Sequence, residues 1–153
     1  MLNTKYVAVH YDEKTQRNLR AWCKENNFNL TYKYDKTRIP PSKFVFHTTI
    51  VYSTNQFEND MDGEYETEFY VYPLFFETLG VDRVIPVLRV ASSELSEVRN
   101  LFCGNLCMKD KWDIWKAHIS LSYAPDLSKD CIKNLTLPTF PLVVNKIVVK
   151  NAE

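Results

Sequence analysis

Phe46-His47-Thr48-Thr49-Ile50 is the stretch from which the architecture of this chain is inferred, because its pattern occurs a second time. The later copy is Ala117-His118-Ile119-Ser120-Leu121. Each copy has the order apolar, His, any residue, hydroxyl, apolar. Because side chains alternate between the two faces of an extended strand, the His and the hydroxyl of each copy share one face. The apolar neighbours are then expected to face a core.

Placed side by side, the two strands would bring two imidazoles and two hydroxyls to one surface. This set suits a phosphodiester, because one His can take a proton from the attacking oxygen while the other protonates the leaving oxygen. The hydroxyls would hold the non-bridging oxygens. The predicted catalytic residues are therefore His47, Thr49, His118 and Ser120. The third histidine, His10, is followed two places on by Asp12 and does not fit the pattern.

Length and composition indicate one soluble globular domain over residues 1–153, with 45% hydrophobic and 25% charged residues. No apolar run approaches the ~20 residues of a membrane span, and the first residues lack a secretory signal, so we expect a cytoplasmic protein. Nineteen basic and nineteen acidic residues give zero net charge, which argues against binding duplex nucleic acid but allows a small nucleotide. The cysteines, expected to be free thiols rather than metal ligands, are Cys23, Cys103, Cys107 and Cys131.

Periodicity and capping signals predict strands and helices in the order β-α-β, further strands, then α-β-β. The expected strands are Lys5–Tyr11, Lys43–Tyr52, Glu64–Phe76, Val81–Val90, Ile114–Tyr123 and Leu142–Lys150. One helix is expected from an Asp12 cap to Phe28, and another from Ser92 or Ser93 to about Cys103. The polar segment Ser53–Gly63 is expected to be a loop and a candidate lid.

This order predicts an α+β fold of two pseudo-symmetric βαβ-type lobes. Central antiparallel sheets would form a groove that carries both motif strands, and the helices would lie outside. Tyr11 ends the first strand and is the one residue that we expect to stack on a nucleobase. Trp115 and Tyr123 fall on the opposite face from His118 by strand parity.

With its two His-x-Thr/Ser motifs, the chain resembles the 2H phosphoesterase superfamily over essentially its full length; Ser120 replaces the commoner Thr. Within that superfamily it is similar to the phage T4-type anti-CBASS nucleases in its size and in the stretches Lys5–Asp12 and Phe46–Tyr52. The resemblance implies metal-independent cleavage of 3′–5′ bonds in cyclic di- or trinucleotides, without a cofactor. Such an activity would block the CBASS antiviral response in the host bacterial cytoplasm.

Three alternatives remain open from the sequence. Another 2H enzyme, acting on 2′,3′-cyclic phosphate ends or on 2′–5′ oligoadenylates, would share the four catalytic residues. A protein that sequesters a cyclic nucleotide would perform no chemistry. An interaction domain would carry His47 and His118 as partly buried, hydrogen-bonded strand residues.

Overall fold

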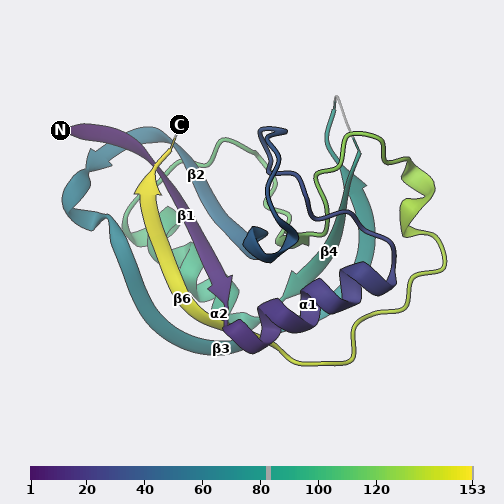
Figure 1. Ribbon diagram of the computed structural model, residues 1–153. Helices are drawn as coiled ribbons and strands as arrows, with labels where there is room; N and C mark the ends of the chain where they lie inside the picture. Colours follow the sequence, from purple (N-terminus) through teal and green to yellow (C-terminus); the bar gives the residue numbers. More distant parts are fainter. Residues whose placement is uncertain (82–83, 153) are drawn as a thin grey trace.

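Figure 1 shows a computed structural model of the chain, in which residues 1–81 and 84–152 are described. In this part of the chain six antiparallel strands form one sheet in the order β2-β1-β6-β3-β4-β5. The sheet curls until its edge strands β2 and β5 adjoin, which gives a nearly closed barrel. The strands are β1 (Leu2–Tyr11), β2 (His47–Glu58), β3 (Gly63–Leu79), β4 (Ile85–Ala91), β5 (His118–Ser120) and β6 (Leu142–Asn151).

The predicted two-lobe fold with helices outside a central groove is wrong, and strand β3 is the reason. β3 is 17 residues long; its first part pairs with β6 and its second part pairs with β4. Register shifts between Glu66 and Phe69 and between Pro73 and Phe75 interrupt its pairing. Such bulges bend a strand and increase its twist. One bent strand therefore joins both halves of the chain into a single sheet.

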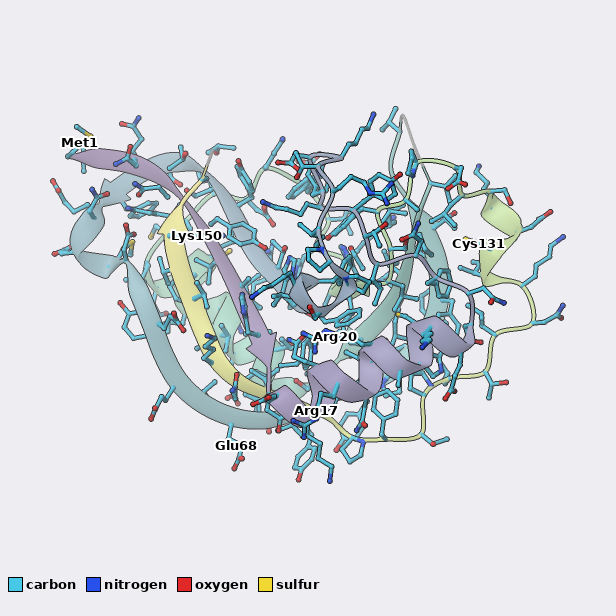
Figure 2. The ribbon with its side chains drawn as sticks, in the orientation of Figure 1. Met1, Arg17, Arg20, Glu68, Cys131 and Lys150 are labelled. Atoms are coloured by element: carbon cyan, nitrogen blue, oxygen red, sulfur yellow. The ribbon has the colours of Figure 1, made fainter. Side chains whose placement is uncertain are left out.

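Helix α1 (Glu13–Glu25) starts where its cap was predicted, because Asp12 accepts a hydrogen bond from the Thr15 amide at 2.8 Å. Its apolar side packs into the core, while Arg17 lies on the solvent side (Figure 2). The second helix, α2 (Ser93–Arg99), begins at the predicted cap Ser92 and continues as a π-helix over Asn100–Asn105. In the described residues no helix is long and apolar enough to span a membrane.

The core lies between the sheet and these helical segments. Fully buried side chains, each worth about 1.5–3 kcal/mol of apolar burial, come from both motif strands and from neighbouring elements. They include Val7, Val9, Leu19, Phe46, Ile50, Leu95, Ile119, Leu121 and Leu142.

The predicted bounds of several segments differ from the structure, including the expected strand Lys43–Tyr52, which begins at His47, and the expected helix to Phe28, which ends at Glu25. Residues 53–58 of the expected loop and lid belong to β2, because Ser53 is buried and its hydroxyl accepts a hydrogen bond from the Lys5 amide at 2.7 Å. β5 has only three residues, although the amide of Leu121 and the carbonyl of Ala117 still bond to β4. The expected strand Val81–Val90 begins at Ile85, and its residues 82–83 lie outside the described part.

Candidate active site

The two motif strands meet at the seam where the barrel nearly closes. The indole N–H of Trp115, just before β5, donates to the Thr49 carbonyl of β2 at 2.9 Å. Arg99 extends this link, because its guanidinium donates to the Ile50 carbonyl at 2.6 Å and pairs with Asp110 at 2.7 Å. The Arg99 guanidinium also stacks over the Trp115 ring, 4.9 Å from its centroid. These contacts hold β2 against the segment that leads into β5.

Both motif strands alternate their side chains as the sequence predicted. In β2, His47 and Thr49 are half-buried, while Thr48 and Ile50 are buried. In the second copy, His118 and Ser120 are half-buried, while Ile119 and Leu121 are buried. The structure therefore brings the four predicted catalytic residues to one side of the seam, away from the core.

The two histidines have the same orientation relative to their own backbone. The Nδ1 of His47 lies 3.3 Å from the Val45 carbonyl, and the Nδ1 of His118 lies 2.6 Å from the Lys116 carbonyl. A carbonyl oxygen can only accept, so each Nδ1 carries the proton and donates it. The Nε2 atom of each ring is then left to exchange a proton with a bound molecule.

Burial is the main cause that lowers the pKa of both histidines below the ordinary value. For His47 the bond to Val45 opposes this shift, and the positive charges of His118 and Lys150 lower the pKa further. For His118 the bond to the Lys116 carbonyl opposes the shift.

Tyr6 of β1 is a site residue that the sequence reasoning missed. Its hydroxyl lies 3.0 Å from the Thr49 hydroxyl, and its ring stands edge-on to His47 at 6.3 Å between centroids. Burial raises the pKa of Tyr6 to about 12, so the phenol stays protonated at neutral pH. It therefore orients the Thr49 hydroxyl as a neutral hydrogen-bonding group.

His10, which does not fit the sequence pattern, is nevertheless a direct neighbour of His47. The two residues are cross-strand partners in the β1–β2 ladder, and their rings are 5.9 Å apart. Burial lowers the pKa of His10 to about 4, and the charges of His47, Lys146 and Lys150 add to this effect. The only signal that could have identified His10 is its strand register.

His118 has a different set of neighbours. Its cross-strand partner in β4 is Arg89, which forms an ion pair with Glu77 of β3 at 2.5 Å and lies over the Phe75 ring at 5.2 Å. Arg89 lowers the pKa of His118, and Glu77 raises it. The buried Nε of Arg89 has no hydrogen-bond partner among the described residues, so it is a donor that a bound anion could use.

Tyr11, the predicted base-stacking residue, is not brought to this face. Only 3% of its surface is exposed, and its hydroxyl lies 2.7 Å from the hydroxyl of Thr48, which faces the core. Regular alternation along β1 places Tyr11 on the same face as the buried Val7 and Val9. A fully packed ring cannot stack on a ligand, so Tyr11 is corrected to a core residue.

Side chains suited to metal binding do not gather at the seam. Within residues 1–81 and 84–152 no group of three or more His, Cys, Asp or Glu is arranged to hold a metal ion. The four cysteines are free thiols, as the sequence predicted.

Comparison with known proteins identifies the family. Among curated proteins no match is found. The family model "Anti-CBASS protein Acb1" matches residues 3–151, a span of nearly the whole chain. The chain therefore belongs to the Acb1 family of anti-CBASS proteins.

Proposed function

We propose that this protein counters CBASS signalling as a phosphodiesterase that cleaves 3′–5′ bonds of cyclic di- or trinucleotides without a metal ion. Family membership supports the anti-CBASS role and cyclic nucleotide messengers as the ligand class. The observation that carries the chemistry is the matched pair of histidines. Each donates its Nδ1 proton to a backbone carbonyl and keeps Nε2 for the substrate.

In the proposed reaction the ribose 2′-hydroxyl attacks the neighbouring phosphorus. One neutral imidazole accepts the hydroxyl proton as the O2′–P bond forms. The P–O5′ bond breaks, and the other imidazole, in its protonated form, gives its proton to the leaving O5′. The first product is a linear nucleotide with a 2′,3′-cyclic phosphate end. Water in place of the 2′-hydroxyl would give a linear product directly.

The hydroxyls and Arg89 would stabilise the charge that develops on the phosphate. Thr49 is held by Tyr6, so its position is set before the substrate binds. Ser120 is paired with Val87 in the β4–β5 ladder, two pairs along from the Arg89–His118 pair. Donors that are oriented in advance stabilise a transition state without the cost of reorganisation.

The charges around the two histidines favour different roles. The charged groups that act on His47 are His118 and Lys150, both of which favour its neutral form. The carboxylate of Glu77 favours the protonated form of His118 against the larger opposing effect of Arg89 and that of Lys116, whereas no carboxylate of the described residues acts in this way on His47. We therefore assign His47 as the base and His118 as the acid for attack by the 2′-hydroxyl.

The experiment that tests this function is incubation with 3′,3′-cyclic GMP–AMP and excess EDTA, followed by mass spectrometry. We expect a linear product, which disappears with His47→Ala and with His118→Ala while circular dichroism shows the fold unchanged. Binding with intact nucleotide recovered would contradict hydrolysis and favour sequestration. Cleavage of 2′–5′ oligoadenylates or of 2′,3′-cyclic phosphate ends, with cyclic dinucleotides left intact, would instead favour another 2H activity.

A further inference from the structure

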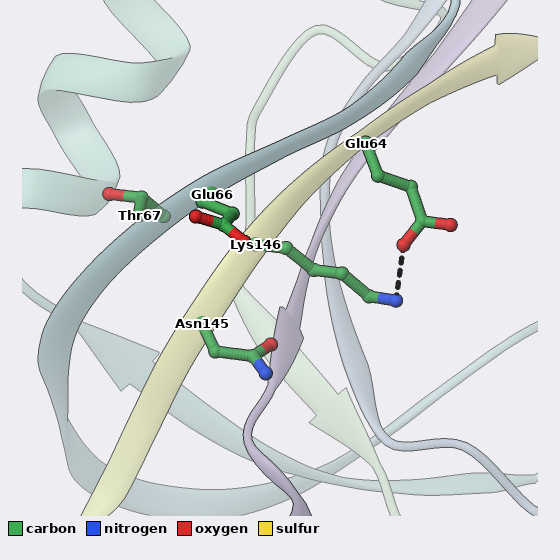
Figure 3. Close-up of a pocket in the computed structure, with 5 residues that line it drawn as sticks. All are labelled: Glu64, Glu66, Thr67, Asn145 and Lys146. Atoms are coloured by element: carbon green, nitrogen blue, oxygen red, sulfur yellow. Dashed lines mark hydrogen bonds and ion pairs between the residues drawn. The ribbon is translucent and has the colours of Figure 1, made fainter.

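A polar pocket opens on the sheet next to His10. It has a volume of about 430 Å³. Figure 3 shows its lining, contributed by β3 and β6: Glu64, Glu66, Thr67, Asn145 and Lys146. Neither the family match nor the proposed chemistry gives this pocket a role.

Irregular strand pairing creates the pocket. The β3–β6 register shifts between Glu66 and Phe69. On the other side of β6, the register with β1 shifts between His10 and Tyr11, which leaves Asn145 without a pairing partner in either ladder. Bulges occur frequently next to active sites, where they redirect side chains. Here they turn part of a regular sheet surface into a hollow lined by polar groups.

The pocket lies on the same face as His47. Cross-strand partners run from His47 to His10, from His10 to Lys146, and from Lys146 to Glu66. Directly paired residues point to the same side of a sheet, and neighbouring strands are about 4.8 Å apart. Lys146 is therefore about 10 Å from His47 across two strand spacings. A nucleotide whose phosphate lies at the histidines can extend its base over His10 to the pocket.

The polar groups of the pocket are not all engaged with one another. The Lys146 ammonium is bound to the Glu64 carboxylate, as the dashed line in Figure 3 marks. The Glu66 carboxylate has no hydrogen-bond or ion-pair partner in the described part of the chain. The side-chain amide of Asn145 has none there either. A carboxylate accepts from exocyclic amino groups and ring N–H groups, and an Asn amide pairs with adjacent N6–H and N7 of adenine.

We infer that this pocket is the subsite for a purine base bearing an exocyclic amino group. The inference rests on the proposed function, because it places the base of the same cyclic nucleotide. Both adenine and guanine carry such an amine. Glu66 would accept from the N1–H and N2 amine of guanine, whereas Asn145 would pair with the N6 amine and N7 of adenine. The two side chains therefore give separate tests for the two bases.

The test is calorimetric binding of cyclic di-AMP, cyclic di-GMP and cyclic di-IMP to the His118→Ala variant, which leaves the ligands intact. Cyclic di-IMP lacks the exocyclic amine. We expect it to bind about tenfold more weakly than the better of the other two, the effect of one lost charge-assisted hydrogen bond. In the same His118→Ala background, Glu66→Gln should weaken the binding of cyclic di-GMP by a similar factor if guanine occupies the pocket. Asn145→Ala should weaken the binding of cyclic di-AMP by that factor if adenine occupies it.

Glu68→Gln is the matched control, because Glu68 is an exposed carboxylate of the same strand whose side chain points away from the sheet (Figure 2). Equal binding of all three nucleotides, or unchanged affinities in both pocket variants, would overturn the inference. If wild-type protein still hydrolysed the nucleotides in that case, the proposed function would stand alone. No binding of any of the three, together with no hydrolysis, would overturn both.

Discussion

The two His-containing segments have the same local geometry but lie in different surroundings. His47 begins a strand of 12 residues, and its charged or titratable neighbours are His10, Lys150 and His118. His118 begins a strand of three residues and lies beside Arg89, which is paired with Glu77. Each imidazole nevertheless makes the same bond to the carbonyl two residues before it.

This difference shows that two levels of structure set the properties of the two histidines. The local chain conformation orients each ring, since the carbonyl that holds Nδ1 belongs to the residue two places before it, just ahead of the strand. The neighbouring strands supply the charges, which differ between the two rings although burial lowers the pKa of both. A repeated motif can therefore place two groups of the same orientation in different electrostatic surroundings.

The largest expected effect separates the two roles by means of the leaving group. Replacing either histidine by Ala should lower kcat for a cyclic dinucleotide by about 10²–10⁴-fold. On adenosine 3′-(4-nitrophenyl phosphate), whose leaving group needs no proton, His118→Ala should recover most of its rate, whereas His47→Ala should not. Stopped-flow absorbance of released nitrophenolate measures both variants. Recovery in His47→Ala instead would reverse the assignment.

The next effect tests the carboxylate beside His118. Because burial lowers the pKa of both histidines, the kcat/KM profile of the free enzyme should be bell-shaped with its optimum below pH 6.5. Glu77→Gln removes a charge that raises the pKa of His118, so the alkaline limb should move to lower pH by up to about one unit.

The control for this measurement is the acid limb, which His47 governs and which should stay in place. A shift of the acid limb alone would show that Glu77 acts on His47. Equal shifts of both limbs would show that the two histidines titrate as one coupled pair.

A smaller effect tests the seam that brings the segments together. Trp115→Phe keeps an aromatic ring beside Arg99 but removes the indole N–H that donates to Thr49. We expect a loss of about 1 kcal/mol in the free energy of unfolding, measured by urea denaturation, together with a several-fold lower kcat. Trp112→Phe, a change at an exposed tryptophan beside Tyr52, is the control. Equal stability and rate in both variants would show that the bond is dispensable.

The smallest effect concerns His10. Its folded pKa of about 4 lies below the ordinary 6.5, so folding disfavours its protonation. The stability that neutral His10 contributes is complete above pH 6.5 and is lost as the pH falls towards 4. His10→Asn should therefore make the decline of Tm between pH 6.5 and 4 shallower than in the wild type. Parallel declines would contradict the lowered pKa. The carboxylates titrate in both proteins, so their contribution to the decline of Tm is the same in the wild type and in the variant.

The parts of the site that the sequence predicted are those that depend on neighbouring residues along the chain. Strand alternation placed His47 with Thr49 and His118 with Ser120, and the caps Asp12 and Ser92 were found because a helix N-terminus leaves amide donors unpaired. Tyr11 was misplaced because its position at the end of the first strand was the only ground for the prediction, whereas strand alternation puts it on the core face with Val7 and Val9.

The sequence alone determined the two motifs, the face that each presents and the chemistry that two imidazoles and two hydroxyls can perform. Tertiary structure alone decided that β3 joins both halves into one barrel, that His10 lies against His47, and that Arg89 and Glu77 lie by His118. The physical reason is the distance along the chain between the residues that must interact. Side-chain direction follows from φ and ψ within a strand, whereas partners across strands depend on long-range register, which bulges in β1, β3 and β6 shift by whole residues.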